Sequence, residues 1–131
     1  MSYQIGFYNG WSGEERLAAL PILRAALEAG TLDPPTRCSM CLVTGSPDWR
    51  AADGIVFHDE DYSNPLAAYT VCKPCHRLIH MRFWSAADWI ALVARHARDG
   101  AWFERLSMDP DSRTRPFVQT YPDGLPSAFH P

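Results

Sequence analysis

The chain has 131 residues, of which 47% are hydrophobic and 21% are charged, and its formal net charge is −3. This length and composition are typical of one folded domain and argue against long disorder, collagen-like repeats and coiled coil. The acidic balance argues against a non-specific cationic coat for nucleic acid, so any such contact must be local. No apolar run approaches the ~20 residues that span a bilayer. The N-terminus also lacks a signal-peptide pattern, so we expect a cytoplasmic protein with no membrane partner.

The N-terminal region is predicted to form an aromatic arm followed by a helix. Ser12 and Glu15 have the spacing of a capping box, which predicts a helix over about residues 13–29. Gly30 follows where a glycine commonly ends a helix. Pro21 lies inside this range and is expected to kink the helix or split it. Four aromatic side chains of the arm are expected to pack on the core: Tyr3, Phe7, Tyr8 and Trp11.

The middle of the chain predicts a hairpin and two helices. Two short β-like runs, residues 55–57 and 69–71, are separated by a long connection and favour a β-hairpin. Pro74 then stands in the first turn of a helix over about residues 73–83, where its missing N–H costs little. A further helix is expected over about residues 86–98.

The C-terminal residues 109–131 contain five prolines and few aliphatic side chains. We expect an irregular tail there, partly held by three aromatic side chains. These side chains are Phe117, Tyr121 and Phe129. Just before the tail, a second group is expected to fold back onto the core, namely Trp102, Phe103 and Leu106.

Four cysteines form two CxxC pairs, Cys38 with Cys41 and Cys72 with Cys75. In a chain without a secretion signal, this pattern predicts metal binding rather than disulfides. Four thiolates suit a tetrahedral structural zinc site, and free buried thiols are the alternative. A closed four-sulfur site has no open coordination position, so it would stabilise the fold and perform no chemistry.

Two histidines of the predicted helix suggest a second site. His76 and His80 are spaced i, i+4 and therefore share one helix face. Neighbouring helical residues point about 100° apart, so His76 is directed away from a zinc ion held by Cys75. The alternative is a solvated or hydrogen-bonded histidine pair.

Several separated motifs then agree in order and spacing with those of one nuclease family. The motifs are CSMC at 38–41, VFHDEDYSNPL at 56–66, VCKPCH at 71–76, and His80. Together they resemble the HNH endonucleases and are similar to the small phage-type members. The resemblance covers about residues 38–83, a third of the chain, and does not extend to the flanking residues.

The resemblance implies an α+β, treble-clef-like ββα-metal core and hydrolysis of nucleic-acid phosphodiesters with one divalent metal ion. It implies that His76 and His80 are the helix ligands of that ion and that His58 is the hairpin ligand. The structural ion would be zinc at the four cysteines, while the catalytic ion could be Mg²⁺, Mn²⁺, Ni²⁺ or Zn²⁺. The implied partner is nucleic acid, expected to be DNA, and the oligomeric state stays open.

Two positions depart from the family pattern. Asp59 stands where the family carries the histidine that acts as general base, and Ala67 stands at the family's central asparagine. In another register His58 becomes the base, which leaves Phe57 at a ligand position where it cannot bind metal. An HNH-like zinc module that binds nucleic acid or protein without turnover is therefore the alternative function.

Residues 73–98 carry five basic side chains and one acidic side chain and could form a phosphate track. Lys73, Arg77 and Arg82 are the predicted nucleic-acid contacts, and the two arginines are preferred because they lie on the motif helix. The other two basic side chains are Arg95 and Arg98. Alternatively, these charges solvate helix faces and pair with residues 48–61, which carry five acidic side chains and one basic side chain. Trp84, Trp89 and Trp102 are expected to pack in the core rather than stack on bases.

These observations predict a single domain in four parts. The parts are an arm and helix over 1–37, a zinc-binding HNH-like core over 38–83, a packing helix over 84–108, and an irregular Pro-rich tail over 109–131.

Overall fold

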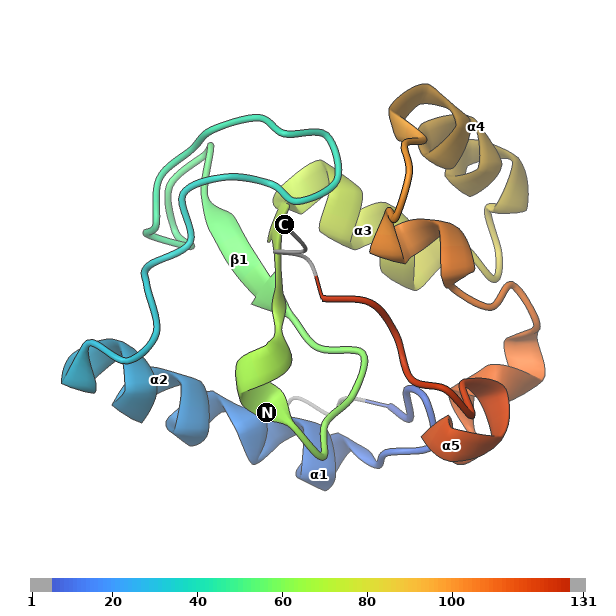
Figure 1. The fold of residues 1–131 in the computed structure, drawn as a ribbon, viewed down its shortest axis with the longest axis horizontal. Helices are drawn as coiled ribbons and strands as arrows, with labels where there is room; N and C mark the ends of the chain where they lie inside the picture. The colour runs from blue at the N-terminus through green and yellow to red at the C-terminus, as the bar shows by residue number, and fades with distance from the viewer. Residues whose placement is uncertain (1–5, 128–131) are drawn as a thin grey trace, which may run out of the picture. The chain divides into compact units, whose positions relative to one another are not determined.

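The computed structural model describes residues 6–127 (Figure 1). The chain divides into two compact units whose segments alternate along the sequence. Each unit is built from three segments. The first unit contains residues 6–34, 59–68 and 109–124. The second unit contains residues 35–58, 69–108 and 125–127. The HNH-like stretch is thus shared, because residues 59–68 group with the first unit.

The predicted N-terminal helix of the first unit is split in two. Helix α1 spans Gly13–Leu17 and helix α2 spans Ala19–Ala29. Proline cannot donate to the carbonyl four residues earlier and its ring clashes with that carbonyl, so Pro21 accounts for the end of α1 at Leu17. Pro21 lies in the first turn of α2, where no N–H donor is needed. The predicted capping box at the start of α1 and the left-handed Gly30 after α2 are both confirmed.

A tight turn precedes α1 and anchors the aromatic arm in the first unit. Tyr8 and Trp11 exchange two backbone hydrogen bonds of 3.0 Å. The two residues between them, Asn9 and Gly10, have positive φ values of 52° and 87°. A Cβ atom at Gly10 would lie 2.7 Å from the carbonyl oxygen of Arg115, so this position requires glycine. The turn therefore packs closely against a C-terminal segment of the same unit.

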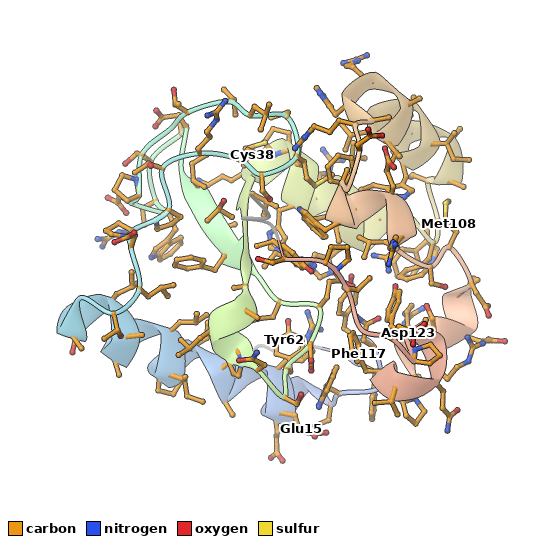
Figure 2. All side chains as sticks on the ribbon, viewed as in Figure 1. Glu15, Cys38, Tyr62, Met108, Phe117 and Asp123 are labelled. Atoms are coloured by element: carbon orange, nitrogen blue, oxygen red, sulfur yellow. The ribbon has the colours of Figure 1, made fainter. Side chains whose placement is uncertain are left out.

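The rings of the arm are only partly buried as predicted. Trp11 packs between Tyr62 and Phe117, with ring centroids 5.8 and 5.4 Å away (Figure 2 labels both partners). Tyr8 and Phe117 are buried, but Phe7 is 50% exposed, so its predicted core packing is wrong. The predicted contacts of Tyr3 and Phe129 lie outside the described residues.

The C-terminal segment of the first unit is more regular than the proline content suggested. It forms a 3₁₀ turn, η3, over Pro110–Arg113 and a short helix, α5, over Phe117–Thr120. Tyr121 follows α5 and is buried, as predicted. A further 3₁₀ turn, η1, spans Pro65–Ala67 and packs on α2.

The second unit is built on the predicted hairpin and helix. Strand β1 spans Ile55–His58 and pairs antiparallel with β2, which spans Tyr69–Cys72. His58 is opposite Tyr69 in the register. Helix α3 spans Lys73–Met81 and packs on both strands. The chain passes from β2 into α3 without a loop, so the last residue of the strand is also the helix cap.

Helix α4 spans Ala86–His96 and packs on α3, and the 3₁₀ turn η2 spans Trp102–Arg105. Trp84 is 63% exposed, which overturns its predicted core position. The other predicted core residues here are buried, namely Trp89, Trp102, Phe103 and Leu106. The mixed α+β class predicted from the sequence is confirmed. Within residues 6–127, no helix combines the length and apolar character needed to cross a bilayer.

Candidate metal centres

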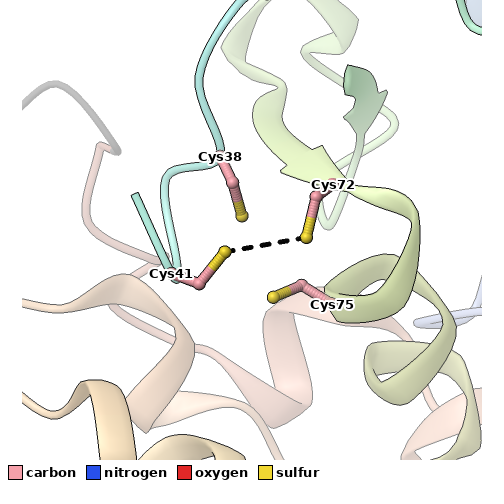
Figure 3. Close-up of side chains that lie close together, drawn as sticks. All are labelled: Cys38, Cys41, Cys72 and Cys75. Carbon is pink, nitrogen blue, oxygen red and sulfur yellow. Dashed lines mark hydrogen bonds between the residues drawn. The ribbon is translucent and has the colours of Figure 1, made fainter. Parts of the chain in front are cut away.

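The four cysteines converge in the second unit, and their sulfur atoms point toward one another (Figure 3). All four Sγ atoms lie within 4.8 Å of one another, and those of Cys41 and Cys72 are 3.7 Å apart. Ligands bound to zinc at about 2.3 Å lie about 3.8 Å apart across a tetrahedral angle. The spacing therefore fits four thiolates around one metal ion such as zinc.

The first CxxC pair lies on a short hairpin-like turn. The Cys38 amide donates to the Val43 carbonyl at 2.8 Å, and the Leu42 amide donates to the Cys38 carbonyl at 3.0 Å. The Met40 amide also donates to the Cys38 sulfur at 3.4 Å, a contact that favours thiolate. Leu42 has a φ of 68°, a left-handed conformation that is costly for a side chain such as leucine. The turn that directs the two sulfurs therefore carries a conformational cost at Leu42.

The second CxxC pair uses the start of α3. Cys72 is the residue that caps this helix and Cys75 is its third residue. Backbone N–H groups and the positive end of the helix dipole are concentrated at these positions. Both features stabilise negative sulfur, so the helix start is suited to hold thiolate ligands.

The pKa values of the clustered thiols depend on the hydrogen bonds among them. Hydrogen bonds from Cys72 and Cys75 lower the pKa of Cys38. The hydrogen bond to Cys38 in turn raises the pKa of Cys72 to about 12, and the same sharing raises the pKa of Cys75. Four thiolates therefore require a cation to balance them, which is the charge that a divalent metal ion supplies.

Residues outside the motif hold the first cysteine turn in place. Arg98 donates to the carbonyl oxygens of Met40, at 2.9 Å, and Ser39. Trp102 donates its indole N–H to the Ser39 hydroxyl at 3.1 Å, and the Ser39 amide donates to Thr70 of β2 at 2.7 Å. Arg98 is thus committed to the protein backbone, which removes it from the predicted phosphate track.

The three predicted histidines also converge. Ring nitrogens of His58, His76 and His80 all lie within 4.8 Å of one another. The Nε2 atoms of His76 and His80 are 3.1 Å apart. Two nitrogens bound to zinc at about 2.0–2.1 Å lie about 3.3 Å apart across a tetrahedral angle. The cluster therefore has the spacing that a shared divalent cation requires.

The histidine cluster is more open than the cysteine cluster. His58 ends β1 and is 2% exposed, whereas His76 and His80 lie one turn apart on α3 and are half-buried. Among the described residues, the cluster contains three side chains with metal-binding atoms. Three protein ligands with an accessible side are typical of catalytic metal sites, which keep one position for water or substrate.

The contact that holds His58 in place could not be predicted from the sequence. The Trp102 ring stacks on His58 with centroids 6.2 Å apart and on Tyr69 with centroids 3.7 Å apart. Because Trp102 also bonds to Ser39, this indole connects the cysteine turn to the histidine cluster. No spacing rule in the sequence relates position 102 to positions 39 and 58, so only the fold reveals this contact.

Asp59, the predicted general base, follows His58 in the chain and belongs to the first unit. Its side chain is 6% exposed, and its Oδ1 atom makes no hydrogen bond in the described part of the chain. Burial, and next the charges of Asp61 and Glu60, raise the pKa of Asp59 to about 7. The catalytic role of Asp59 stays a prediction.

Glu60 and Asp61 have structural partners of their own. Glu60 is buried and accepts hydrogen bonds from the Tyr8 hydroxyl and, at 2.9 Å, from the Asn9 amide group. Asp61 accepts hydrogen bonds from the backbone and hydroxyl of Ser63, at 3.0 and 2.6 Å. Both carboxylates therefore shape the connection between the two strands.

The three predicted nucleic-acid contacts differ in their surroundings. Arg77 is exposed, and Lys73 is exposed but donates to the Ala51 carbonyl at 2.7 Å. Arg82 is 0% exposed and donates to the carbonyls of Ile79, at 2.8 Å, and Ser107, at 2.7 Å. A buried guanidinium held by backbone carbonyls cannot reach a phosphate in solvent, so Arg82 has a structural role. Its spacing from the buried residues 75 and 79 was a signal of this burial.

No protein-family model, curated protein or solved structure matches this chain. The resemblance to HNH endonucleases therefore rests on the motif residues themselves. The cysteine cluster can bind a metal ion such as zinc.

Proposed function

We propose that the protein is an HNH-like, metal-dependent nuclease that hydrolyses nucleic-acid phosphodiester bonds, with zinc at its four cysteines as a structural ion. The observation that carries the proposal is the convergence of His58 from the hairpin with His76 and His80 from α3. This is the ligand arrangement that the family resemblance implies, and a treble-clef-like core is proposed with it.

The residues fit the proposed ions. Four sulfurs suit a closed structural zinc site, and three imidazoles with an accessible side suit a hydrolytic ion. His58, His76 and His80 would hold that second ion through their ring nitrogens. When bound, a divalent ion would supply positive charge to polarise the scissile phosphate and its leaving oxygen.

The roles of the other residues follow from their positions. Asp59 directly follows His58 and occupies the base position of the resembling family, so it would take the proton of the attacking water. Arg77 is an exposed cation of α3 and would position the phosphate backbone. Neither residue is needed to hold the metal ions.

Metal-dependent nicking of plasmid DNA tests the proposal. The zinc-loaded protein should nick supercoiled DNA after addition of Mg²⁺, Mn²⁺, Ni²⁺ or Zn²⁺, and His80→Ala should remove this activity. Nicking that survives in His80→Ala would assign the activity to a contaminant or to another site. A wild-type protein that is inert on single- and double-stranded DNA and RNA with all four ions would end the proposal.

Asp59→His tests the base position separately. A histidine there restores the residue type that the resembling family uses, so nicking should increase. General-base catalysis contributes about 10²–10⁴-fold, so partial repair should be visible on a gel. Unchanged nicking in Asp59→His, with activity still dependent on His80, would place the base elsewhere.

A non-catalytic binding module is the second candidate. It is favoured by the two positions that depart from the family pattern, Asp59 and Ala67. Under this alternative, the zinc-loaded protein binds oligonucleotides or a protein while no added metal ion produces cleavage. Single-turnover assays with excess protein separate the two functions, because even slow chemistry then yields product.

A further inference from the structure

A groove separates α3 from α4 within the second unit and has a volume of about 410 Å³. Side chains of both helices line the groove. Arg77 and Leu78 lie on α3, while Asp88, Leu92 and Arg95 follow an i, i+4, i+7 pattern on α4. Ala91 of α4 also lines the groove. The groove is therefore formed by side chains of two packed helices rather than by loops.

The lining combines charges with apolar surface. Arg77 and Arg95 are exposed guanidinium groups, and Asp88 is an exposed carboxylate at the start of α4. Leu78 and Leu92 are half-buried and supply apolar surface between the charges. Arginine binds phosphate well, apolar surface accepts the face of a base, and a carboxylate accepts hydrogen bonds from exocyclic amino groups.

The groove and the histidine cluster share helix α3. Arg77 lies in the groove, and His80 lies three residues later. Residues three apart on a helix are separated by about 60° around the axis and about 4.5 Å along it. Leu78, the other side chain of α3 named above, lies about 160° around the axis from His80, so a strand reaches the groove from the histidines by passing over Arg77.

The size of the groove limits its occupant. Pockets of about 300–1,000 Å³ hold small organic ligands, a range that includes one nucleotide. A base paired inside a duplex cannot enter such a hollow, whereas an unstacked base of a single strand can. Size, charge and position together select a nucleotide of an unpaired strand.

We propose that the groove between α3 and α4 binds one nucleotide of single-stranded nucleic acid, on the same strand as the phosphate that the histidine cluster engages and beyond Arg77 from it. The proposal rests on the proposed function for the identity of the strand, and it adds the substrate class. The phosphate contacts Arg77 and Arg95, and the base lies on Leu78 and Leu92. Unpaired strands are therefore preferred over intact duplex.

Filling the groove tests the proposal without altering charge. Ala91→Phe places a ring in the groove, and Ala94→Phe adds the same ring to an exposed position of α4 outside it. Binding is measured by fluorescence anisotropy of labelled single-stranded DNA and RNA, on the zinc-loaded full chain carrying His80→Ala. Ala91→Phe should weaken binding about tenfold, and Ala94→Phe should not change it.

A charge variant keeps the test valid if the added ring disturbs the fold. Arg95→Ala should weaken binding and lower the slope of log affinity against log salt by about one, with Arg105→Ala as the matched exposed control. Far-UV circular dichroism and zinc content establish that each variant is folded. Equal effects in Ala91→Phe and Ala94→Phe, or equal affinity for duplex and single strand, would overturn the proposal.

The outcomes separate this proposal from the proposed function. If the protein binds single strands through the groove but cleaves no nucleic acid, the groove is supported as a binding site and the nuclease function is excluded. If the wild type cleaves nucleic acid and the variants Ala91→Phe, Arg95→Ala and Ala94→Phe cleave it equally well, the nuclease function is supported and the groove is excluded as the binding site.

Discussion

The cysteine and histidine clusters are built from the same hairpin and helix but differ in ligand number and access. Four sulfurs meet at one, and three of the four cysteines are buried. Three imidazoles meet at the other, and two of them remain partly accessible. A site with four protein ligands has no open coordination position and is suited to hold the fold, while one with three ligands and an open side is suited to chemistry.

Helix α3 accounts for the separation of the two clusters. Its first turn supplies Cys72 and Cys75, where unpaired N–H groups favour thiolate. Its next turns supply His76 and His80, where the backbone is already hydrogen-bonded and only the side chains are available. One short helix therefore directs two ligand types to two different faces.

The largest expected effect tests the structural role of the cysteine cluster. Cys72→Ser should unfold or aggregate the chain, because zinc binding is worth about 10–16 kcal/mol in small zinc domains and acts as folding energy. Far-UV circular dichroism and metal analysis should show loss of structure together with loss of one zinc ion per chain. A cooperatively folded, zinc-free monomer would contradict this role.

The second effect tests whether the histidine cluster is independent of the fold. His80→Ala should keep one zinc ion per chain and a cooperative unfolding transition. It should weaken the binding of a second ion by more than about 10–100-fold, the loss seen when even a partner of a metal ligand is removed. Calorimetric titration of the zinc-loaded protein with Co²⁺ measures this. Loss of the tightly bound zinc in His80→Ala would mean that the two clusters are not separate.

A smaller effect tests the indole that connects the clusters. Trp102→Phe keeps an aromatic ring but removes the hydrogen bond to Ser39, so unfolding in urea should require about 1–3 kcal/mol less free energy. Binding of Co²⁺ at the histidine cluster should weaken by less than about tenfold, since every ligand is retained. Trp84→Phe is the matched control at an exposed site. Equal results for the two variants would argue against the connection.

The smallest effect concerns the left-handed residue of the cysteine turn. Leu42→Gly should stabilise the zinc-loaded protein by about 0.5–1 kcal/mol, because relief of the left-handed strain exceeds the added entropy of unfolding. Val43→Gly, at the neighbouring exposed position without positive φ, should destabilise it. Urea unfolding of both variants gives the comparison. A destabilised Leu42→Gly would mean that the leucine side chain contributes more than its strain costs.

Local patterns predicted most of the elements, while motif spacing predicted the cysteine cluster and the family resemblance added His58 to the histidine pair. The capping box at Ser12 and the i, i+4 spacing of His76 and His80 depend on residues close in sequence, so their geometry follows from the helix itself. The position of Pro21 likewise predicted a split in the N-terminal helix. Such predictions succeed because few backbone conformations can satisfy them.

Tertiary contacts account for what could not be predicted. The stack of Trp102 on His58 joins positions far apart in the sequence, and no periodicity records it. The grouping of residues 59–68 with the first unit is also a property of the folded chain. Arg82 is a different case, because its spacing from Cys75 and Ile79 placed it on the buried face, yet its charge suggested exposure.

The alternation of the two units along the sequence has a practical consequence for dissecting the protein. The chain passes from one unit to the other after residues 34, 58, 68, 108 and 124. No single cut can release either unit as one continuous piece, and a fragment of residues 38–83 would carry part of the first unit without the rest. Gene truncation is therefore a poor tool here. Point substitutions in the full-length chain, or a circular permutant that keeps every segment, are the appropriate ways to take this protein apart.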